Sequence, residues 1–152
     1  MEPDRRRPAA VVALVVVLLV QGVGGLAGGL ALAASPKGGI IKLPVSDLAG
    51  SPFHDYLLPG LILALVLGLG PLMAAWVLVR RPPWPAAEVV NPFRHEYWGW
   101  TLSGVVGVGL LIWIAVEVTI IPYNALQPVF GAVGLAIVAL TLLPSVRAWY
   151  QR

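Results

Sequence analysis

Long apolar stretches alternate with short polar ones along the whole chain. Four of them are nearly free of charge and long enough to cross a hydrocarbon core of about 30 Å, which takes about 20 helical residues. They cover residues 8–34, 55–79, 97–121 and 125–143. The pattern predicts an all-α membrane protein with a single transmembrane domain over residues 1–152, a four-transmembrane-helix bundle with longer loops at 35–54 and 80–96.

Composition supports a membrane protein. The chain of 152 residues is 59% apolar and 11% charged, which lies well outside the range of soluble domains. It contains no cysteine, which excludes disulfides, thiolate metal ligands and thiol redox relays. We expect neither a metal nor a cofactor.

Basic residues predict the orientation of the helices, because positive charge is retained on the cytoplasmic side during insertion. Two of the ten, Lys37 and Lys42, lie in the loop at 35–54. The other eight fall on the opposite side of the predicted bundle: Arg5, Arg6, Arg7, Arg80, Arg81, Arg94, Arg147 and Arg152. We therefore expect both termini in the cytoplasm and a location in the cell (inner or plasma) membrane. The basic balance reflects this topology, and nucleic acid is not an expected partner.

The first apolar stretch shares features with a signal peptide, namely a basic start and an Ala-x-Ala pattern at Ala31 and Ala33. Its apolar run, residues 8–34, is much longer than the roughly 7–15 residues of a signal-peptide core. We expect a retained helix.

Glycines recur at helical spacing. Gly24 with Gly28, and Gly25 with Gly29, form two overlapping small-xxx-small pairs in the first predicted helix, and Gly104 repeats the theme in the third. Such glycines let another helix backbone approach closely in lipid. Close packing within one chain is the favoured interpretation, and contact between copies of the chain is the alternative.

Both longer loops have membrane-surface character. The loop at 35–54 mixes apolar residues with Lys42, Asp47 and glycines, so we expect an interfacial cover over the helix ends, with a lid as the alternative. The loop at 80–96 is rich in Pro, Trp and Tyr, which is typical of an anchor in the headgroup layer.

The stretch SPFHDYLLPG, residues 51–60, predicts an irregular start to the second helix. Ser51 suits an N-cap, and Pro52 suits the first helical position, where its missing N–H costs nothing. Pro59 would then fall about two turns into the helix. Because its ring removes a hydrogen bond and Gly60 adds flexibility, the two predict a bend or break.

Between the third and fourth predicted helices, IPYNALQP is short enough for a tight turn. Asn124 is a candidate N-cap for the last helix, and Pro128 would lie within its first turns.

A resemblance accompanies these motifs. The stretch SPFHDYLLPGLIL, Gly68 within the second helix, the segment LIWIAVEVTII and the start LQPVFGAVGL resemble a family of small four-helix bacterial integral membrane proteins of unknown function. The similar region runs from about Gly38 to Leu143. The resemblance implies the architecture, and no activity, cofactor or binding residue comes with it.

Glu117 is the one ionisable residue inside a predicted span. A charge at the bilayer centre costs about 2.5–3.5 kcal/mol on insertion scales, so such a residue prompts a functional hypothesis. A hydrogen bond between helices is the structural interpretation, and contact with a ligand or a transported proton is the functional one.

Further polar residues lie toward the same predicted external side. If the helices form a compact bundle, these residues could line one cavity together with Glu117; they are Gln21, His54, Asp55, Tyr123, Asn124 and Gln127. Carbonyls freed by a helix break could also bind a cation or a polar head group beside His54 and Asp55, although an interfacial turn of helix is the plainer interpretation. Polar residues confined to one half favour a binding pocket over a through-pore.

Enzyme motifs are missing, among them H-E-x-x-H, G-x-S-x-G and a Gly-rich phosphate loop with Lys. No residue is a catalytic candidate. The favoured hypothesis is a non-catalytic protein that binds a lipid, a small amphiphile or a partner membrane protein, including another copy of itself, through its external half. One alternative is an oligomeric transporter or proton-coupled channel that uses Glu117, and another is a small membrane-embedded acid–base enzyme.

Overall fold

The computed structural model describes residues 6–152, so Arg5 lies outside the described residues. None of the described residues forms a strand, which confirms the all-α prediction. The elements follow in the order α1 (Ala9–Ala34), the 3₁₀ turn η1 (Val45–Leu48), α2 (Leu57–Ala64), the π-helical segment η2 (Leu65–Leu69), α3 (Gly70–Arg80), α4 (Pro85–Val90), α5 (Trp98–Ile120), α6 (Leu126–Leu142) and α7 (Pro144–Tyr150).

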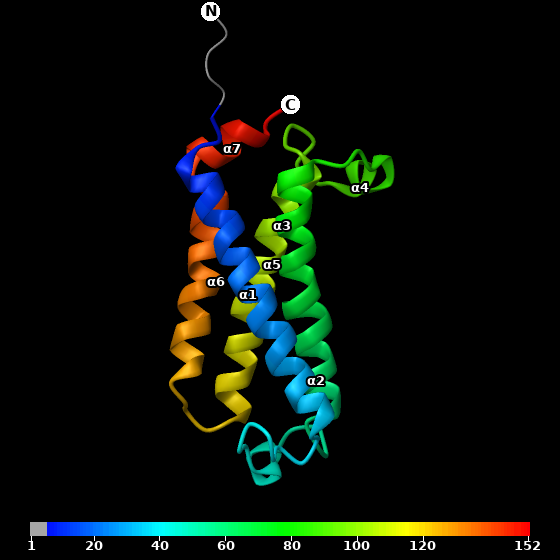
Figure 1. The fold of residues 1–152 in the computed structure, drawn as a ribbon, viewed down its shortest axis with the longest axis vertical. Helices are drawn as coiled ribbons and strands as arrows, with labels where there is room; N and C mark the ends of the chain where they lie inside the picture. Colours follow the sequence, from blue (N-terminus) through cyan, green and yellow to red (C-terminus); the bar gives the residue numbers. More distant parts are fainter. Residues whose placement is uncertain (1–5) are drawn as a thin grey trace, which may run out of the picture.

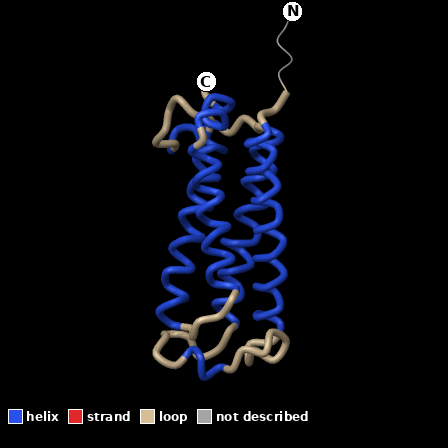
Figure 2. The backbone as a smooth tube through the Cα atoms, turned by 90° about the vertical axis from the view of Figure 1, so that its left-hand side faces the viewer, coloured by secondary structure: helices blue, strands red, loops and turns tan. Residues whose placement is uncertain are grey.

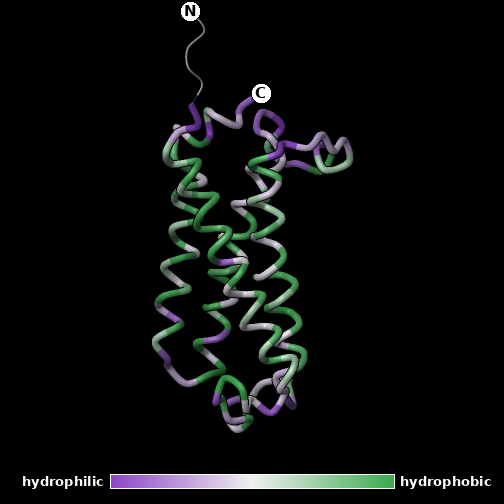
Figure 3. Tube along the Cα trace, in the orientation of Figure 1, coloured by the Kyte–Doolittle hydropathy of each residue, from purple (hydrophilic) through white to green (hydrophobic). Residues whose placement is uncertain are grey.

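Within the described part of the chain, three helical stretches are long and apolar enough to cross a membrane: α1, the continuous stretch from α2 to α3, and α5. A fourth results if α6 and α7, which meet at an angle of 60°, count as one span. Figure 3 shows apolar residues along the lengths of these helices and hydrophilic residues gathered toward the two ends. The chain is that of a membrane protein.

The helices run side by side along one long axis (Figures 1 and 2). The start of α1 and the C-terminal segment lie at one end of the molecule, here called the terminal end, and residues 35–56 and 121–125 lie at the other, here called the loop end. Helix α1 packs against α2, η2, α3 and α6, whereas α5 packs against α6 and α3. In the half near the loop end the helices therefore form two pairs, α1 with α2 and α5 with α6.

Most of the apolar core lies in the half near the terminal end. Its buried members come from α1, the last turns of α3, the start of α5, α6 and α7, and include Val11, Leu14, Leu18, Val77, Leu78, Trp100, Ile137, Val146 and Tyr150. A smaller cluster of Leu32, Leu48 and Tyr56 occupies the loop end.

Helix α7 folds across the terminal end and closes it. The Tyr150 hydroxyl donates to the Leu78 carbonyl at 2.9 Å, and the Arg147 guanidinium contacts the buried carboxylate of Glu96 at 2.7 Å. A buried carboxylate is stable only when it is paired. The C-terminal segment is thus fixed to the bundle by both apolar and ionic contacts.

Glycines join α1 closely to the α2–η2 stretch. A Cβ atom on Gly25 would lie 2.2 Å from the Leu67 carbonyl oxygen, and one on Gly29 would lie 2.4 Å from the Ala64 nitrogen. From the other side, a Cβ on Gly60 would lie 2.8 Å from the Ala33 nitrogen. Only glycine fits at these positions, because the two backbones are in contact.

Other glycines predicted to pack have different surroundings. A Cβ on Gly24 would meet no described atom within 4 Å, and one on Gly28 would meet only the Leu63 side chain, at 3.7 Å. A Cβ on Gly104 would reach only the Thr141 side chain, also at 3.7 Å. Within one chain, the predicted close approach of another helix backbone at these three glycines is therefore wrong, because a Cβ there would meet no described backbone atom within 4 Å.

The second spanning stretch begins later than predicted, at Leu57. Ser51 is not its N-cap, because the Ser51 hydroxyl accepts the Phe53 N–H at 3.2 Å in a local turn. Asp55 satisfies the helix start instead, since its Oδ1 accepts the Leu57 N–H at 2.9 Å.

Pro59 is the third residue of α2. The N–H groups of a first helical turn have no carbonyl partner within the helix, so proline there costs no hydrogen bond. The predicted break at Pro59 and Gly60 is therefore wrong. Gly60 serves the close contact with α1.

The irregularity of this span lies further along, at η2. Its π turn precedes Pro71, which lacks the N–H that an α-helix would direct at the Leu67 carbonyl. The side-chain nitrogen of Gln21 on α1 donates to that carbonyl at 3.3 Å. Residues far apart in the sequence thus complete the backbone hydrogen bonding of the membrane span.

Candidate functional site

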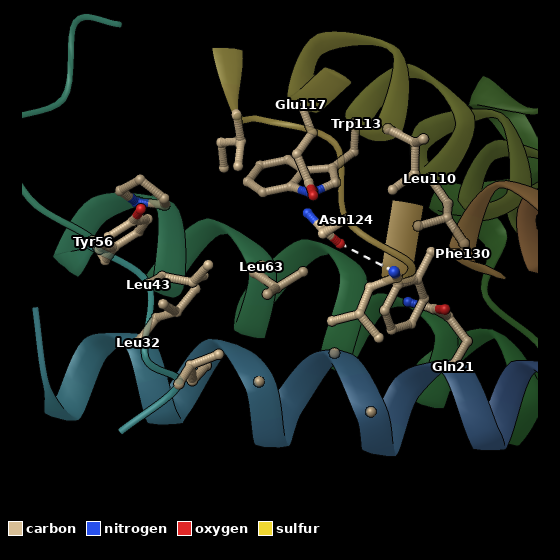
Figure 4. A pocket seen from close by; sticks show the side chains of 18 of the residues that line it. Gln21, Leu32, Leu43, Tyr56, Leu63, Leu110, Trp113, Glu117, Asn124 and Phe130 are labelled. Atoms are coloured by element: carbon tan, nitrogen blue, oxygen red, sulfur yellow. Dashed lines mark hydrogen bonds between the residues drawn. The ribbon is translucent and has the colours of Figure 1, made fainter. Parts of the chain in front are cut away.

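A cavity of about 430 Å³ lies in the half near the loop end, between the two helix pairs (Figure 4). Its walls are mostly apolar, and its polar side chains are few. The lining includes Gln21, Gly24, Gly28, Ile41, Leu43, Leu48, Tyr56, Leu63, Trp113, Glu117, Asn124 and Leu126. A cavity of this size and character is typical of a small-molecule site.

Glu117 lines the cavity from α5, about one turn before the helix ends at Ile120. Its Oε2 accepts the indole N–H of Trp113 at 3.0 Å. The two residues are four apart, so they lie on the same face of the helix. This contact lies within α5. The Gln127 side chain of α6 also interacts with the Glu117 carboxylate, in keeping with the predicted contact between helices.

Gln21 lines the cavity from α1 and is only 2% exposed. Its Nε2 is committed to the Leu67 carbonyl. Among the buried side-chain nitrogen and oxygen atoms of the described residues, its Oε1 is the one that has no hydrogen-bond partner. A buried acceptor without a donor is costly, so this oxygen is a point at which a bound molecule would be stabilised.

Asn124 lines the cavity from the turn before α6. The N-cap of α6 is Ala125, so Asn124 lies one residue before the position that was predicted for it, although its Oδ1 accepts the Leu126 N–H at 3.0 Å. Pro128 lies in the first turn of α6, as predicted. In Figure 4 the polar ends of Asn124 and Glu117 point toward the same part of the cavity, and Gln21 lies further along α1.

The loop at the loop end closes the outer side of the cavity. Its apolar residues Ile41, Leu43 and Leu48 form part of the wall. The Tyr56 hydroxyl donates to the Pro44 carbonyl at 3.0 Å and ties the loop to the start of α2. Burial raises the pKa of the Tyr56 phenol above its ordinary value, and the negative charge of Asp47 raises it further.

Two glycines of α1 leave space for the cavity because they have no side chains. Gly24 and Gly28 both line it, and side chains at these positions would extend into the open space described above. Gly24 and Leu126 of α6 also lie at the exposed surface of the molecule. The cavity therefore reaches the side of the bundle between α1 and α6, where a membrane protein faces lipid.

The remaining predicted site residues do not line the cavity. His54 is exposed, and the Asp55 carboxylate is occupied at the start of α2. Tyr123 is 81% exposed. Gln127 is buried, with its side-chain nitrogen 3.5 Å from the Ile121 carbonyl oxygen. The hypothesis of freed carbonyls beside His54 and Asp55 has no basis, because α2 is not broken there.

Sequence reasoning missed Trp113, Tyr56 and the apolar loop residues as parts of the site. Trp113 could have been found, because a tryptophan four residues from the one intramembrane carboxylate is on its helix face. Tyr56 and the loop carried no such signal, because their positions depend on how the loop folds back.

The described wall of the cavity carries an acidic side chain and no basic one. None of the described residues that line the cavity is Lys, Arg or His, whereas one carboxylate and two amides are present. Across residues 6–152, no group of three His, Cys, Asp or Glu side chains is placed to hold a metal ion. The arrangement offers free acceptor capacity on Gln21 and Glu117, and the uncharged Nδ2 donor of Asn124, within an apolar enclosure.

Comparisons of the chain with models of protein families, with curated proteins and with solved structures found no match.

Proposed function

We propose that this protein spans the cell membrane four times, with both termini in the cytoplasm, and binds an amphiphilic molecule without catalysis in the cavity near its loop end. The observation that carries the proposal is the cavity itself, about 430 Å³ of mostly apolar space with a few polar groups. Pockets of this kind bury most of a small ligand, while the polar groups set its orientation.

The contrast between the two halves supports binding over transport. The half near the terminal end is filled by the apolar core and covered by α7. A conducting path would need polar lining at both ends. The polar residues of the cavity, Gln21, Glu117 and Asn124, all belong to one half.

Charge supports the orientation. The described basic residues at the terminal end are Arg6, Arg7, Arg80, Arg81, Arg94, Arg147 and Arg152. Lys37 and Lys42 lie at the loop end. An excess of Lys and Arg marks the cytoplasmic side of a membrane protein, which would place the cavity in the external half.

Native mass spectrometry of the detergent-purified protein tests the binding. The wild type is expected to retain a non-protein mass that Gly28→Leu loses, because the leucine would fill the cavity. Gly109→Leu is the matched control, since a Cβ at Gly109 meets no described atom within 4 Å and the residue lies outside this cavity.

Retention of the same mass by the wild type and by both variants would contradict the proposed site. So would a wild type that carries no added mass even after exposure to membrane lipid extract. Loss of the mass in Gly28→Leu alone would support it.

A further inference from the structure

We infer that the cavity selects an apolar molecule whose head group donates hydrogen bonds, a long-chain alcohol or amine, and rejects the same molecule with an anionic head group. This inference rests on the proposed function and narrows its ligand class. It follows from the identity and direction of the polar atoms in the cavity.

The first observation is the orientation of the Gln21 amide. Its Nε2 donates to the Leu67 carbonyl, so a flipped amide would bring two acceptor oxygens together. The remaining atom is therefore fixed as an acceptor, and it is buried without a partner. Only a donor can satisfy it.

The second observation is the carboxylate of Glu117. One of its oxygens accepts the Trp113 N–H, and the Gln127 side chain also interacts with it, whereas a carboxylate has about four acceptor sites on its two oxygens. The group can take further donors from a molecule in the cavity. A charged acceptor makes hydrogen bonds roughly twice as strong as a neutral one does.

The third observation is the lack of basic side chains among the described residues of the cavity wall. Phosphate and carboxylate groups are bound in proteins by Arg, Lys or backbone N–H groups. An anionic head group in this cavity would lose its hydration and meet the Glu117 carboxylate. Both effects disfavour it.

The shape of the cavity indicates that the molecule comes from the membrane. The wall includes exposed positions at Gly24 on α1 and Leu126 on α6. They lie on the side of the bundle, so an alkyl chain can enter from the hydrocarbon layer without crossing the loop.

Photoreactive probes test the selection. Three probes share one alkyl chain with a mid-chain diazirine and differ only in a terminal hydroxyl, amine or carboxylate. Each is added to the purified protein in lipid nanodiscs at neutral pH, and the labelled residues are mapped by peptide mass spectrometry. The hydroxyl or amine probe is expected to label the cavity wall about tenfold or more above the carboxylate probe, the ratio that one hydrogen bond to a charged group provides.

Glu117→Gln distinguishes the two head groups, because the amide oxygen can still accept the Trp113 N–H while the charge is removed. Labelling by the amine probe is expected to fall about tenfold, whereas labelling by the hydroxyl probe is expected to persist. Asp55→Asn is the matched control. This substitution removes a carboxylate that lies at the same end of the molecule but does not line the cavity.

Equal or stronger labelling of the cavity by the carboxylate probe would overturn this inference and leave the proposed function standing. Unchanged labelling by both donor probes in Glu117→Gln would overturn the part assigned to Glu117. If no probe labels the cavity wall of the wild type, and Gly28→Leu retains the same native mass as the wild type, the proposed function itself fails.

Discussion

Gln21 shows how a single polar residue serves two parts of this molecule. Its amide nitrogen completes the hydrogen bonding of a carbonyl ahead of Pro71, and its amide oxygen remains available in the cavity. The side chain is therefore structural at one atom and open to a ligand at the other. Each of these roles requires a polar side chain in the middle of an otherwise apolar helix.

Replacing Gln21 tests the structural half of this role. In Gln21→Leu the Leu67 carbonyl loses its side-chain donor, and we expect a loss of about 0.6–1.7 kcal/mol in the free energy of unfolding, the size of hydrogen bonds between membrane helices. Reversible unfolding in mixed micelles measures it. Adding Pro71→Ala restores a backbone N–H and is expected to recover part of the loss. No recovery would mean that the carbonyl is not what Gln21 stabilises.

Tyr56 makes the attachment of the loop depend on pH. Burial raises the pKa of its phenol, so the folded state favours the neutral form. The stabilisation is complete below the unfolded pKa of about 10 and is lost as the pH rises through the higher folded value. We expect the thermal midpoint of the wild type to fall steeply above about pH 10. We expect Tyr56→Phe to have a lower midpoint at neutral pH, because it loses the bond to the Pro44 carbonyl, and to show a smaller fall above about pH 10. Equal slopes in the two proteins would exclude Tyr56 as the cause.

At the scale of elements, α1 carries two glycine faces with opposite roles. Gly25 and Gly29 bring its backbone against α2 and η2, where a methyl group would overlap backbone atoms. Gly24 and Gly28 face the cavity, whose wall Gly25 also joins at its edge. The first face holds the helix pair together, and the second keeps the space beside it open.

Alanine substitutions separate the two faces. Gly25→Ala places a Cβ 2.2 Å from the Leu67 carbonyl oxygen, so we expect destabilisation of about 1–3 kcal/mol or more from overpacking. Gly24→Ala meets open space and is expected to be neutral or slightly stabilising, because alanine is the better helix former. Unfolding of the two variants in the same detergent compares them directly, and equal losses would contradict the assignment of faces.

For the whole molecule, the difference between the two ends is the main feature. The terminal end is sealed by α7 through Tyr150 and the Arg147–Glu96 pair. At the loop end the helix pairs leave a cavity that the loop covers. The proposed orientation places the sealed end toward the cytoplasm.

Single cysteines test that orientation, because the chain has none of its own. Ser46→Cys lies at the loop end and Ala86→Cys in α4 at the terminal end, both on exposed residues. On intact cells, a membrane-impermeant thiol reagent is expected to label the first, and to label the second only after permeabilisation. The reverse pattern would invert the proposed topology.

Much of the helical layout was predictable from local pattern. The apolar stretches at 97–121 and 125–143 correspond closely to α5 and α6. The start of the second span was not predictable in this way. Ser51 and Asp55 are both good capping residues, and only the folded loop decides which of them caps the helix. Within the candidate site, Glu117, Gln21 and Asn124 line the cavity and His54 and Tyr123 do not, since helical spacing alone does not show which faces converge.

By itself, the sequence determined that this is an all-helical membrane protein and where three of its helices can cross the bilayer, because hydrophobic length is a local property of the chain. Only the tertiary structure decided that Gly25 packs while Gly24 opens a cavity, that Gln21 serves the Leu67 carbonyl, and that Trp113 and Tyr56 belong to the site. These features depend on the rotation and tilt of each helix against its neighbours. Lipid is as apolar as the helix interiors, so hydrophobicity cannot specify the contacts, and close packing and hydrogen bonding between distant residues do.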